Sequence, residues 1–470
     1  MKTDVAYIVS HGFAARMVMQ TNLLGRLVDK GLKVALIAPD SEDENLKKYC
    51  SEKNIRLFEF KAKSSFWSSN YAKARMFFLE NIDKNPALLE KYIYALNFDK
   101  NATFKSRLRI RLFKVAHGLK EVFPFIKSMF KKRESRMLES MEADRLIDEL
   151  NPALLVSTYP VNYTEAMLVK SAQKKGSKTV MHLLSWDNIS CKGHFPVLAD
   201  EYIAWGPIMK DELKEYYGID DSRVYMTGVP HFDLHSESAK DAKEGKYLSP
   251  LGLRADKPYV LFGMSSPRFA PKEIDIVEHL AEQISTGVYG QDVQMVIRPH
   301  PQNIQGNMTD ESWLPRLEQL QNERIALDLP NLAASKMPWS MEHNDMYKLS
   351  NLLAGAALSI NSGSTLSIDA MMCGTPVILS SFDGASMLPY WKSSRRLIDY
   401  THLKKLTMLE GVSVVDSYDR LKEEMQKYLQ DNTYKQNERA NTLNQMCFSQ
   451  DGKATQRVVD TLLTLRSSIN

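Results

Sequence analysis

Several features that mark other classes of protein are missing from this sequence. Its apolar runs are much shorter than the roughly 18 consecutive residues of a membrane-spanning helix. The four cysteines, Cys50, Cys191, Cys373 and Cys447, lack the paired spacing of zinc ribbons and redox motifs. The first strand-like run, Val5–Val9, has no basic region followed by a long apolar stretch. We therefore expect no signal peptide, no spanning helix and reduced thiols in a cytoplasmic protein.

The chain also lacks a strong excess of either charge. Its 61 Lys and Arg residues against 57 Asp and Glu residues give a net charge of +4, which is too small to indicate a nucleic-acid-binding protein. The 44% of hydrophobic and 25% of charged residues are ordinary values for a globular protein. With 470 residues, the chain exceeds the roughly 250 to 300 at which one core stops growing. Two domains are therefore expected.

Apolar strands alternate with helical patterns along most of the chain. One series of predicted strands lies at 6–10, 33–39, 154–160, 179–186 and 201–206, and a second at 258–265, 294–301, 356–363 and 375–381. Such an alternation is typical of parallel sheets covered on both faces. A polar stretch rich in turn-forming residues separates the two series at 236–258. The predicted parts are an N-terminal Rossmann-like domain (1–240), a linker (241–257), a C-terminal Rossmann-like domain (258–450) and a terminal helix (451–470).

A mostly helical insertion at about 61–150 interrupts the first series. Within it, Lys105–Arg136 holds eleven Lys or Arg residues against two glutamates. Apolar residues recur beside them at helical spacing, at Phe104, Leu108, Leu112, Val115, Leu119 and Val122. The pattern fits either a helix that lies on a membrane surface or an ordinary packing helix with a solvated basic face.

A Ser-Gly-Ser-Thr turn follows one strand of the second series. Ser362, Gly363, Ser364 and Thr365 precede a predicted helix, so their N–H groups and hydroxyls offer a binding site for a phosphate or diphosphate. Open α/β sheets bind ligands at this end of their strands. The alternative is that Ser364 or Thr365 only caps the helix.

A histidine between two prolines follows another strand of the same series. Pro299 and Pro301 fix the backbone around His300, and His300 and Arg298 are both able to donate to phosphate oxygens that gain charge as a leaving group departs. A hydrogen-bonded structural role is the alternative for His300. For Arg298 the alternatives are exposure to solvent or an ion pair with a structural carboxylate.

The order of these features resembles the GT-B glycosyltransferases with His-Pro and Ser-Ser/Thr motifs. Those enzymes include bacterial sialyltransferases, capsule Kdo transferases and CDP-glycerol glycerophosphotransferases. The resemblance implies an α/β fold of two Rossmann-like domains that face each other across a cleft, with both motifs holding the nucleotide phosphate. The stretches 185–193, 201–213 and 225–233 also look like surface-polysaccharide transferases of this fold.

The sequence departs from one pattern of the retaining GT-B enzymes. These often carry two glutamates eight positions apart, the second of which binds the nucleotide ribose. Asp369 matches the second position, whereas Asn361 stands at the first. The resemblance therefore implies a ribose-binding role for Asp369, and the alternative is a first-turn acid that favours the helix dipole.

By the same resemblance, the N-terminal domain holds the acceptor. His11 and Asp187 each follow a predicted strand of the first series, at the edge of the sheet where polar groups converge. Both are our candidates for the catalytic group that accepts the acceptor's proton. The alternatives are a loop hydrogen bond for His11 and a turn formed with Asn188 for Asp187.

The residues and the resemblance together predict a metal-independent glycosyltransferase. Its donor is a nucleotide sugar, with a preference for a CMP- or other cytidine-linked one, and its acceptor is a surface polysaccharide or lipid-linked glycan. No spacing of His, Asp and Glu suggests a metal site, and no cofactor is expected beyond the nucleotide sugar. The alternatives are a nucleotide-sugar 2-epimerase of the same fold and a non-catalytic nucleotide-sugar-binding subunit. We also expect Lys105–Arg136 to contact an anionic membrane surface at the inner face of the membrane. A nucleic-acid partner is not expected.

Overall fold

The computed structural model describes residues 2–62, 66–99, 101–235, 241–242, 244–304, 309–332, 341–342 and 344–469. These residues form two compact units. Unit 1 contains the described residues up to Pro230 and those from Lys453 onward, and unit 2 contains those from His231 to Gly452. The chain thus enters unit 2 before the predicted boundary segment, of which residues 236–240 and 243 lie outside the described ranges. No helix in these ranges has both the length and the apolar character needed to cross a membrane.

Unit 1 is built on a parallel sheet. Its described strands are β1 (Thr3–Ile8), β2 (Val34–Ala38), β3 (Arg56–Glu59), β4 (Pro152–Ser157), β5 (Lys178–His182), β6 (Glu201–Ala204) and β7 (Val224–Met226). Their order in the sheet is β3-β2-β1-β4-β5-β6-β7. The strand order reverses between β1 and β4, and ligands of such sheets bind at the carboxyl ends of the strands on either side of the reversal.

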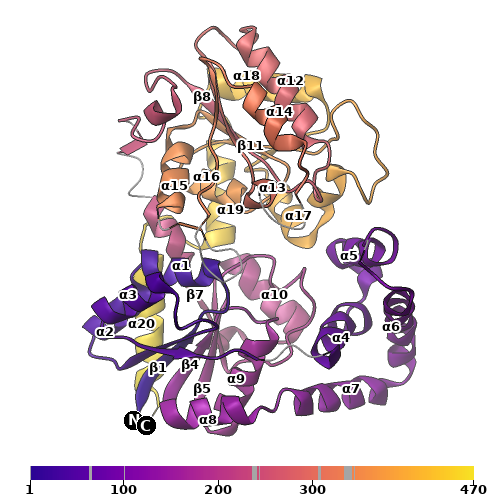
Figure 1. Ribbon diagram of the computed structural model, residues 1–470, viewed down its shortest axis with the longest axis vertical. Coiled ribbons are helices and arrows are strands. Elements are labelled where there is room, and N and C mark those ends of the chain that lie inside the picture. Colours follow the sequence, from indigo (N-terminus) through magenta and orange to yellow (C-terminus); the bar gives the residue numbers. More distant parts are fainter. Residues whose placement is uncertain are drawn as a thin grey trace. The chain divides into compact units, whose positions relative to one another are not determined.

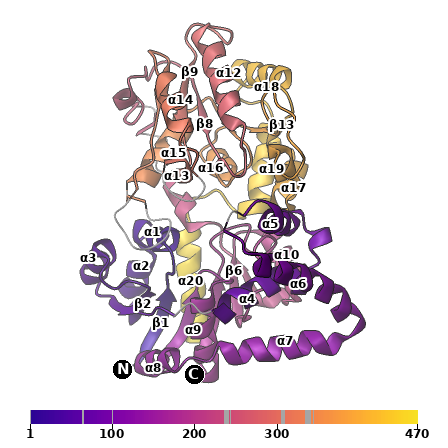
Figure 2. The same cartoon turned by 45° about the vertical axis from the view of Figure 1, so that its right-hand side comes forward.

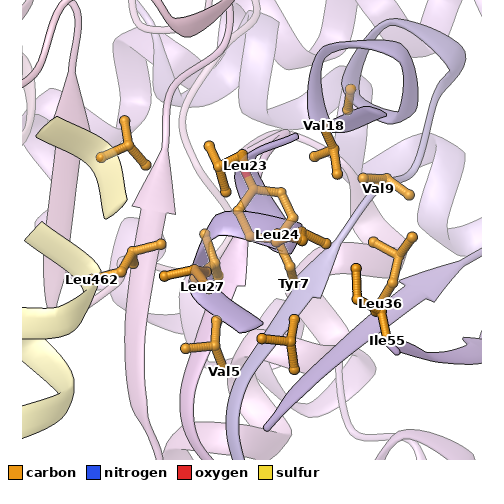
Figure 3. Packing of buried hydrophobic residues seen from close by; sticks show 14 of the residues in the cluster. Val5, Tyr7, Val9, Val18, Leu23, Leu24, Leu27, Leu36, Ile55 and Leu462 are labelled. Atoms are coloured by element: carbon orange, nitrogen blue, oxygen red, sulfur yellow. The ribbon is translucent and has the colours of Figure 1, made fainter. Parts of the chain in front are cut away.

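Helices cover both faces of this sheet. They are α1 (Gly12–Gln20), α2 (Leu23–Asp29), α3 (Glu44–Glu52), α8 (Met141–Leu150), α9 (Tyr163–Lys174), α10 (Pro207–Tyr217) and α20 (Ala454–Ser467). The helix α20, from the far end of the chain, packs against α2 and β4 (Figure 1). Its Leu462 lies in one buried cluster with Val5, Tyr7 and Leu27 (Figure 3). The last helix is therefore part of the core of unit 1.

The insertion between β3 and β4 is helical, as predicted. Its elements are α4 (Phe66–Ala74), the π-helical turn η1 (Arg75–Leu79), the 3-10 turn η2 (Ile82–Lys84), α5 (Pro86–Asn97), α6 (Phe104–Val122) and α7 (Pro124–Met137). Thr103 caps α6 by accepting from the Ser106 N–H at 3.2 Å. Pro124 then ends α6 and starts α7, because proline suits a first helical turn and cannot continue a helix. The helices α4 to α7 lie to one side of the sheet (Figures 1 and 2).

Unit 2 repeats the same sheet order. Its described strands are β8 (Tyr259–Gly263), β9 (Gln294–Arg298), β10 (Ile325–Leu327), β11 (Leu358–Asn361), β12 (Val377–Ser380) and β13 (Ser413–Val415). They are parallel in the order β10-β9-β8-β11-β12-β13. The described helices are α12 (Glu273–Ser285), α13 (Pro301–Ile304), α14 (Trp313–Gln319), α15 (Asp345–Gly355), α16 (Leu366–Met372), α17 (Thr401–Met408), α18 (Tyr418–Gln430) and α19 (Gln436–Cys447). Here the order reverses between β8 and β11.

Two of the predicted element patterns also differ from the structure. The helix predicted near 16–30 is divided into α1 and α2, because Asn22 between them takes a left-handed conformation with φ of 50°. The strands β3, β7, β10 and β13 were not predicted, and each lies at the edge of its sheet. An edge strand is covered less completely than a central one, so it lacks the long apolar run by which the central strands are found.

Candidate functional site

In unit 2, His300 lies immediately after β9, as the sequence predicted. Its Nδ1 accepts a hydrogen bond from the backbone N–H of Gln302 at 3.1 Å. Burial lowers the pKa of His300 to about 4, so the imidazole is neutral near neutral pH. A neutral imidazole that accepts at Nδ1 carries its proton on Nε2. His300 is thus arranged to donate one hydrogen bond from Nε2.

Arg298, at the end of β9, is engaged in buried ion pairs. Its Nη2 donates to both carboxylate oxygens of Asp345 at 2.7 and 2.8 Å, and its Nη1 contacts Asp328. Although burial by itself acts to lower the pKa of Arg298, these two carboxylates raise it. Of the alternatives considered for Arg298, the ion pair with structural carboxylates is the one present. Arg298 therefore holds the end of β9 to α15.

The Ser-Gly-Ser-Thr turn follows β11 at the predicted place, but Asn361 already uses part of it. The Asn361 Oδ1 accepts from the N–H groups of Gly363 at 2.8 Å and Ser364 at 3.1 Å. Gly363 has φ of 106°, and a Cβ there would lie 3.1 Å from Leu403, so glycine is required. Two of the N–H groups expected to bind phosphate are thus bound within the turn. The half-buried Ser364 and Thr365 side chains remain as candidates.

Ser362 in the same turn binds a buried carboxylate. Its hydroxyl donates to Glu273 Oε1 at 2.6 Å and lies 3.0 Å from the Ser380 hydroxyl. The other oxygen of Glu273 accepts from the Ser265 N–H at 2.6 Å, and burial raises the pKa of Glu273 to about 7. Glu273 thereby joins the segments that follow β8 and β11 at the reversal of strand order. Ser362 therefore helps Glu273 to hold these two segments together.

Asp369 on α16 forms a buried pair with a histidine. Its Oδ1 lies 3.0 Å from His235 Nε2, while His235 Nδ1 lies 2.7 Å from the Ser350 hydroxyl. Burial by itself lowers the pKa of His235, but Cys373 and Asp369 beside it raise the pKa to about 10. His235 is therefore charged near neutral pH and fixes one oxygen of Asp369.

Unit 1 also has a buried glutamate that joins two chain segments at its reversal of strand order. Glu165, fully buried in the first turn of α9, accepts from the N–H groups of Thr158 at 2.8 Å and Tyr159 at 3.0 Å. The hydroxyls of Ser10 and Ser157 also donate to it. Burial raises the pKa of Glu165. This carboxylate joins the segments after β1 and β4, as Glu273 does in unit 2.

His11 and Asp187 are connected through Tyr159 and Lys192. The His11 and Tyr159 rings lie 5.1 Å apart between centroids, and Lys192 Nζ lies 5.2 Å from the Tyr159 ring. The same Nζ is 3.1 Å from Asp187 Oδ1. Although burial acts to lower the pKa of Lys192, Asp187 raises it. The structure thus brings the two predicted catalytic residues into one cluster around an ammonium group.

His11 has capacity for a further hydrogen bond. Burial and the nearby Lys192 charge lower the pKa of His11 to about 4, so its ring is neutral. Among the described residues, none hydrogen-bonds to its buried Nδ1. Asp187, by contrast, accepts from the Ser185 hydroxyl at 2.6 Å in addition to its ion pair. An incoming polar ligand would satisfy His11 Nδ1, because buried polar atoms are normally hydrogen-bonded.

The helical insertion holds the loop that carries Asp187. Lys91 of α5 donates to the Cys191 carbonyl at 2.5 Å, and the Asn85 side chain donates to the Ser190 carbonyl at 2.7 Å. Gly193 has φ of 84°, and a Cβ there would lie 2.9 Å from Met76. This close approach explains why glycine stands at the end of the loop.

The supporting residues were not predicted to have functional roles. Glu165, Glu273 and His235 stand in helical or polar segments that resemble many others in the sequence, and only their three-dimensional partners distinguish them. For Lys192 the sequence gives only a weak indication of a functional role, since the residue lies in a polar loop after a predicted strand.

Two further features concern a metal cluster and a surface hollow. The described residues contain no group of three or more His, Cys, Asp and Glu side chains placed to hold a metal ion. A hollow of unit 2 lined by Pro258, Thr375 and Asn432 lies at the amino ends of β8 and β12, opposite to the edge that carries His300. It does not contain any of the predicted site residues.

Comparison with known proteins shows similarity of fold. No protein-family model and no curated protein matches the chain. The UDP-N-acetylglucosamine 2-epimerase from Neisseria meningitidis, solved with UDP-GlcNAc, is 12% identical with a TM-score of 0.55, covering 99% of this chain and 100% of that one. The corresponding enzyme from Methanocaldococcus jannaschii is 13% identical with a TM-score of 0.53, covering 99% and 100%.

A glycosyltransferase also shares the fold. CalG4, the calicheamicin glycosyltransferase, is 11% identical with a TM-score of 0.50, and the similarity covers 100% of this chain and 99% of that one. At these identities the similarity concerns the fold alone. Together with the two parallel Rossmann-like sheets, it shows that this chain has the α/β GT-B fold predicted from its sequence.

Proposed function

We propose that this protein is a glycosyltransferase that uses a nucleotide-activated sugar and no metal ion, with a surface polysaccharide or lipid-linked glycan as acceptor. The observation that carries the proposal is the buried, neutral His300, which follows the carboxyl end of β9 and carries its proton on Nε2. This strand is next to the reversal of strand order in unit 2, where ligands of such sheets bind. A hydrogen bond from Nε2 would stabilise charge that develops on the departing phosphate.

Other residues of unit 2 complete the proposed donor site. The Ser364 and Thr365 hydroxyls would donate to further phosphate oxygens. Asp369 would accept from the ribose hydroxyls with the oxygen that His235 does not bind. Ser362, Gly363 and Arg298 would support these groups, since their own polar atoms are bound within unit 2.

In unit 1, His11 or Asp187 would accept the proton of the acceptor hydroxyl as the new bond forms. His11 offers an Nδ1 without a partner in the described structure. Asp187 offers a carboxylate oriented by Ser185 and Lys192. Comparing the kcat of His11→Asn with that of Asp187→Asn identifies the general base, because replacing the base should cause the larger loss of kcat.

Nucleotide binding tests which nucleobase the donor carries. A cytidine nucleotide was predicted from the His-Pro resemblance, but the similar solved structures support no such preference, and the ligands they name are UDP and UDP-GlcNAc. A thermal-shift screen with CMP, CDP, UDP, GDP and ADP should identify one base, because a ligand of the folded state raises the melting temperature. If none of the five binds, the proposed donor site is wrong.

A nucleotide-sugar 2-epimerase is the second candidate. It is supported by the similarity to UDP-GlcNAc 2-epimerases over nearly the full length of both chains. The two activities differ in what happens to the donor alone in D2O. An epimerase would change the configuration at carbon 2 and introduce deuterium there, whereas a transferase would leave that carbon unchanged. NMR of the recovered nucleotide sugar makes this distinction.

A catalytically silent nucleotide-sugar-binding subunit is the third candidate. It predicts nucleotide binding without any turnover, with or without an acceptor. Incubating the protein with the matching nucleotide sugar and a bacterial lipid extract tests this. Release of nucleotide together with labelling of the lipid fraction would support the transferase and exclude the silent subunit.

A further inference from the structure

The most unusual surface of unit 1 is an exposed apolar stripe along α6. It consists of six residues spaced four, four, three, four and three positions apart: Phe104, Leu108, Leu112, Val115, Leu119 and Val122. At 3.6 residues per turn, this spacing places all six on one side of the helix. Each exposes between 45% and 77% of its surface. Soluble surfaces usually carry single exposed apolar residues rather than a continuous row.

The stripe is not the face by which α6 packs on its own unit. That role belongs to the opposite side, where Ile110 is buried against Phe77 and Leu88, and Phe113 packs beside them. The α6 helix therefore has two apolar faces, of which only one is covered within unit 1.

The apolar surface continues beyond the end of α6. Phe123 and Phe125 lie on either side of Pro124 at the start of α7, with ring centroids 6.1 Å apart, and Met129 follows one turn later. These three side chains expose 48% to 65% of their surface. The stripe and this corner form one surface, which we call the α6–α7 surface.

Basic side chains accompany the α6–α7 surface. The exposed ones are Lys105, Arg111, Lys127, Lys131, Lys132, Arg133 and Arg136. Of the two acids between positions 105 and 136, Glu121 is exposed beside Lys120, whereas Glu134 is buried in an ion pair with Arg75. The accessible charge here is therefore strongly positive, although the whole chain carries only +4.

We propose that the α6–α7 surface docks this protein on an anionic lipid bilayer. A row of Leu, Val and Phe side chains with Lys and Arg beside it fits the interfacial region, where apolar groups enter the acyl boundary and cations meet lipid phosphates. A protein partner fits less well, because protein interfaces are depleted in lysine. Figure 1 shows α6 at the outer edge of the insertion, farther from the sheet of unit 1 than α4 is.

The insertion would also connect the lipid surface to the acceptor side of unit 1. Its α5 helix binds two carbonyls of the loop that carries Asp187 and Lys192. A lipid-linked acceptor held at the bilayer would therefore meet a loop supported by the docking element itself. This connection rests on the proposed function, whereas bilayer docking does not.

The test compares vesicles of phosphatidylcholine alone with vesicles that also contain phosphatidylglycerol. The full-length protein should sediment with the anionic vesicles, and binding should fall as the salt concentration rises. The apolar variant carries Leu112→Gln, Leu119→Gln and Phe125→Gln. It should bind both kinds of vesicle at least 10-fold more weakly than the unchanged protein does. The basic variant carries Lys127→Gln, Lys132→Gln and Arg136→Gln, and it should lose mainly the salt-sensitive part.

Matched controls carry the same kinds of change elsewhere. Met387→Gln with Met408→Gln alters exposed apolar residues of unit 2, and Lys30→Gln with Lys33→Gln and Lys53→Gln alters exposed cations on other parts of unit 1. Both should bind like the unchanged protein, and all variants should keep its melting temperature. The proposal is overturned if the unchanged protein ignores anionic vesicles or if the controls lose binding equally. It is also overturned if the apolar variant only abolishes self-association in sedimentation analysis, because the surface would then bind a second copy.

Discussion

At the residue scale, the candidate site depends on a few buried polar groups that fix its geometry. Glu165 and Glu273 each join the two chain segments at a reversal of strand order, and each is fully buried with raised pKa. Asn361 accepts from two of the N–H groups that were expected to bind phosphate, those of Gly363 and Ser364. His300 and His11 are neutral, so their contribution to ligand binding is a hydrogen bond rather than a charge.

His300 should contribute to nucleotide affinity through Nε2. We expect His300→Ala to weaken nucleotide binding at least 10-fold, equivalent to about 1.4 kcal/mol, because a donor to a phosphate oxygen is lost. Isothermal titration calorimetry with the nucleotide identified by thermal shift measures this. Gln302→Ala is the control, because it retains the N–H that orients the ring. Equal affinities of the unchanged protein and His300→Ala would remove His300 from the donor site.

Glu273 should make stability depend on pH. Because burial raises its pKa from 4.5 to about 7, the folded protein binds more protons than the unfolded chain in this interval. The free energy of unfolding should therefore fall as pH rises from about 4.5 to 7, by at most about 3 kcal/mol. Glu273→Gln lacks this dependence, so its melting temperature should rise relative to that of the unchanged protein between pH 5 and pH 8. A constant difference across this range would contradict the assignment.

At the element scale, the insertion and the last helix have different relations to the first sheet. The insertion contacts the Asp187 loop through α5 and leaves the α6–α7 surface exposed. The helix α20 buries its apolar face against α2 and β4, in the core of unit 1. The sequences of α6 and α20 are both amphipathic. The two helices differ in how many of their apolar side chains are buried against the rest of unit 1.

The packing of α20 predicts its energetic importance. Leu462 is fully buried in the core of unit 1, so Leu462→Ala should lower the free energy of unfolding by about 2 to 5 kcal/mol through lost burial and the remaining cavity. Leu463→Ala is the matched control, because Leu463 is only partly buried and should cost clearly less. Urea denaturation followed by circular dichroism compares the two. Equal losses would mean that α20 is not fixed in the core.

At the scale of the whole molecule, the chain contains two units with separate cores. The core of unit 1 includes residues from both ends of the described chain, whereas that of unit 2 is formed by residues between them. The four edge strands were not predicted, yet the first six strands of each unit follow the same order, and unit 1 adds β7 at one edge. Two Rossmann-like domains could therefore be inferred from the central strands, whereas the GT-B fold was implied by the resemblance in motifs.

Separate cores predict separate responses to ligand and mutation. In differential scanning calorimetry, we expect two overlapping transitions, because each unit can lose its own core. The nucleotide should raise the transition of unit 2, which holds His300, through its binding to the folded state. Leu462→Ala should lower the other transition. A single transition that responds to both changes would show that the units unfold together.

The sequence by itself determined the fold class, the helical insertion and the positions of His300, Asp187 and His11 in segments that follow strands. Apolar periodicity and flanking prolines are local signals, so they can be found along the chain. Only the tertiary structure decided that Arg298 is held by Asp328 and Asp345, and that Asn361 binds two N–H groups of the turn expected to bind phosphate. It also decided which face of α6 is buried. These outcomes depend on contacts between distant residues, which no local pattern records.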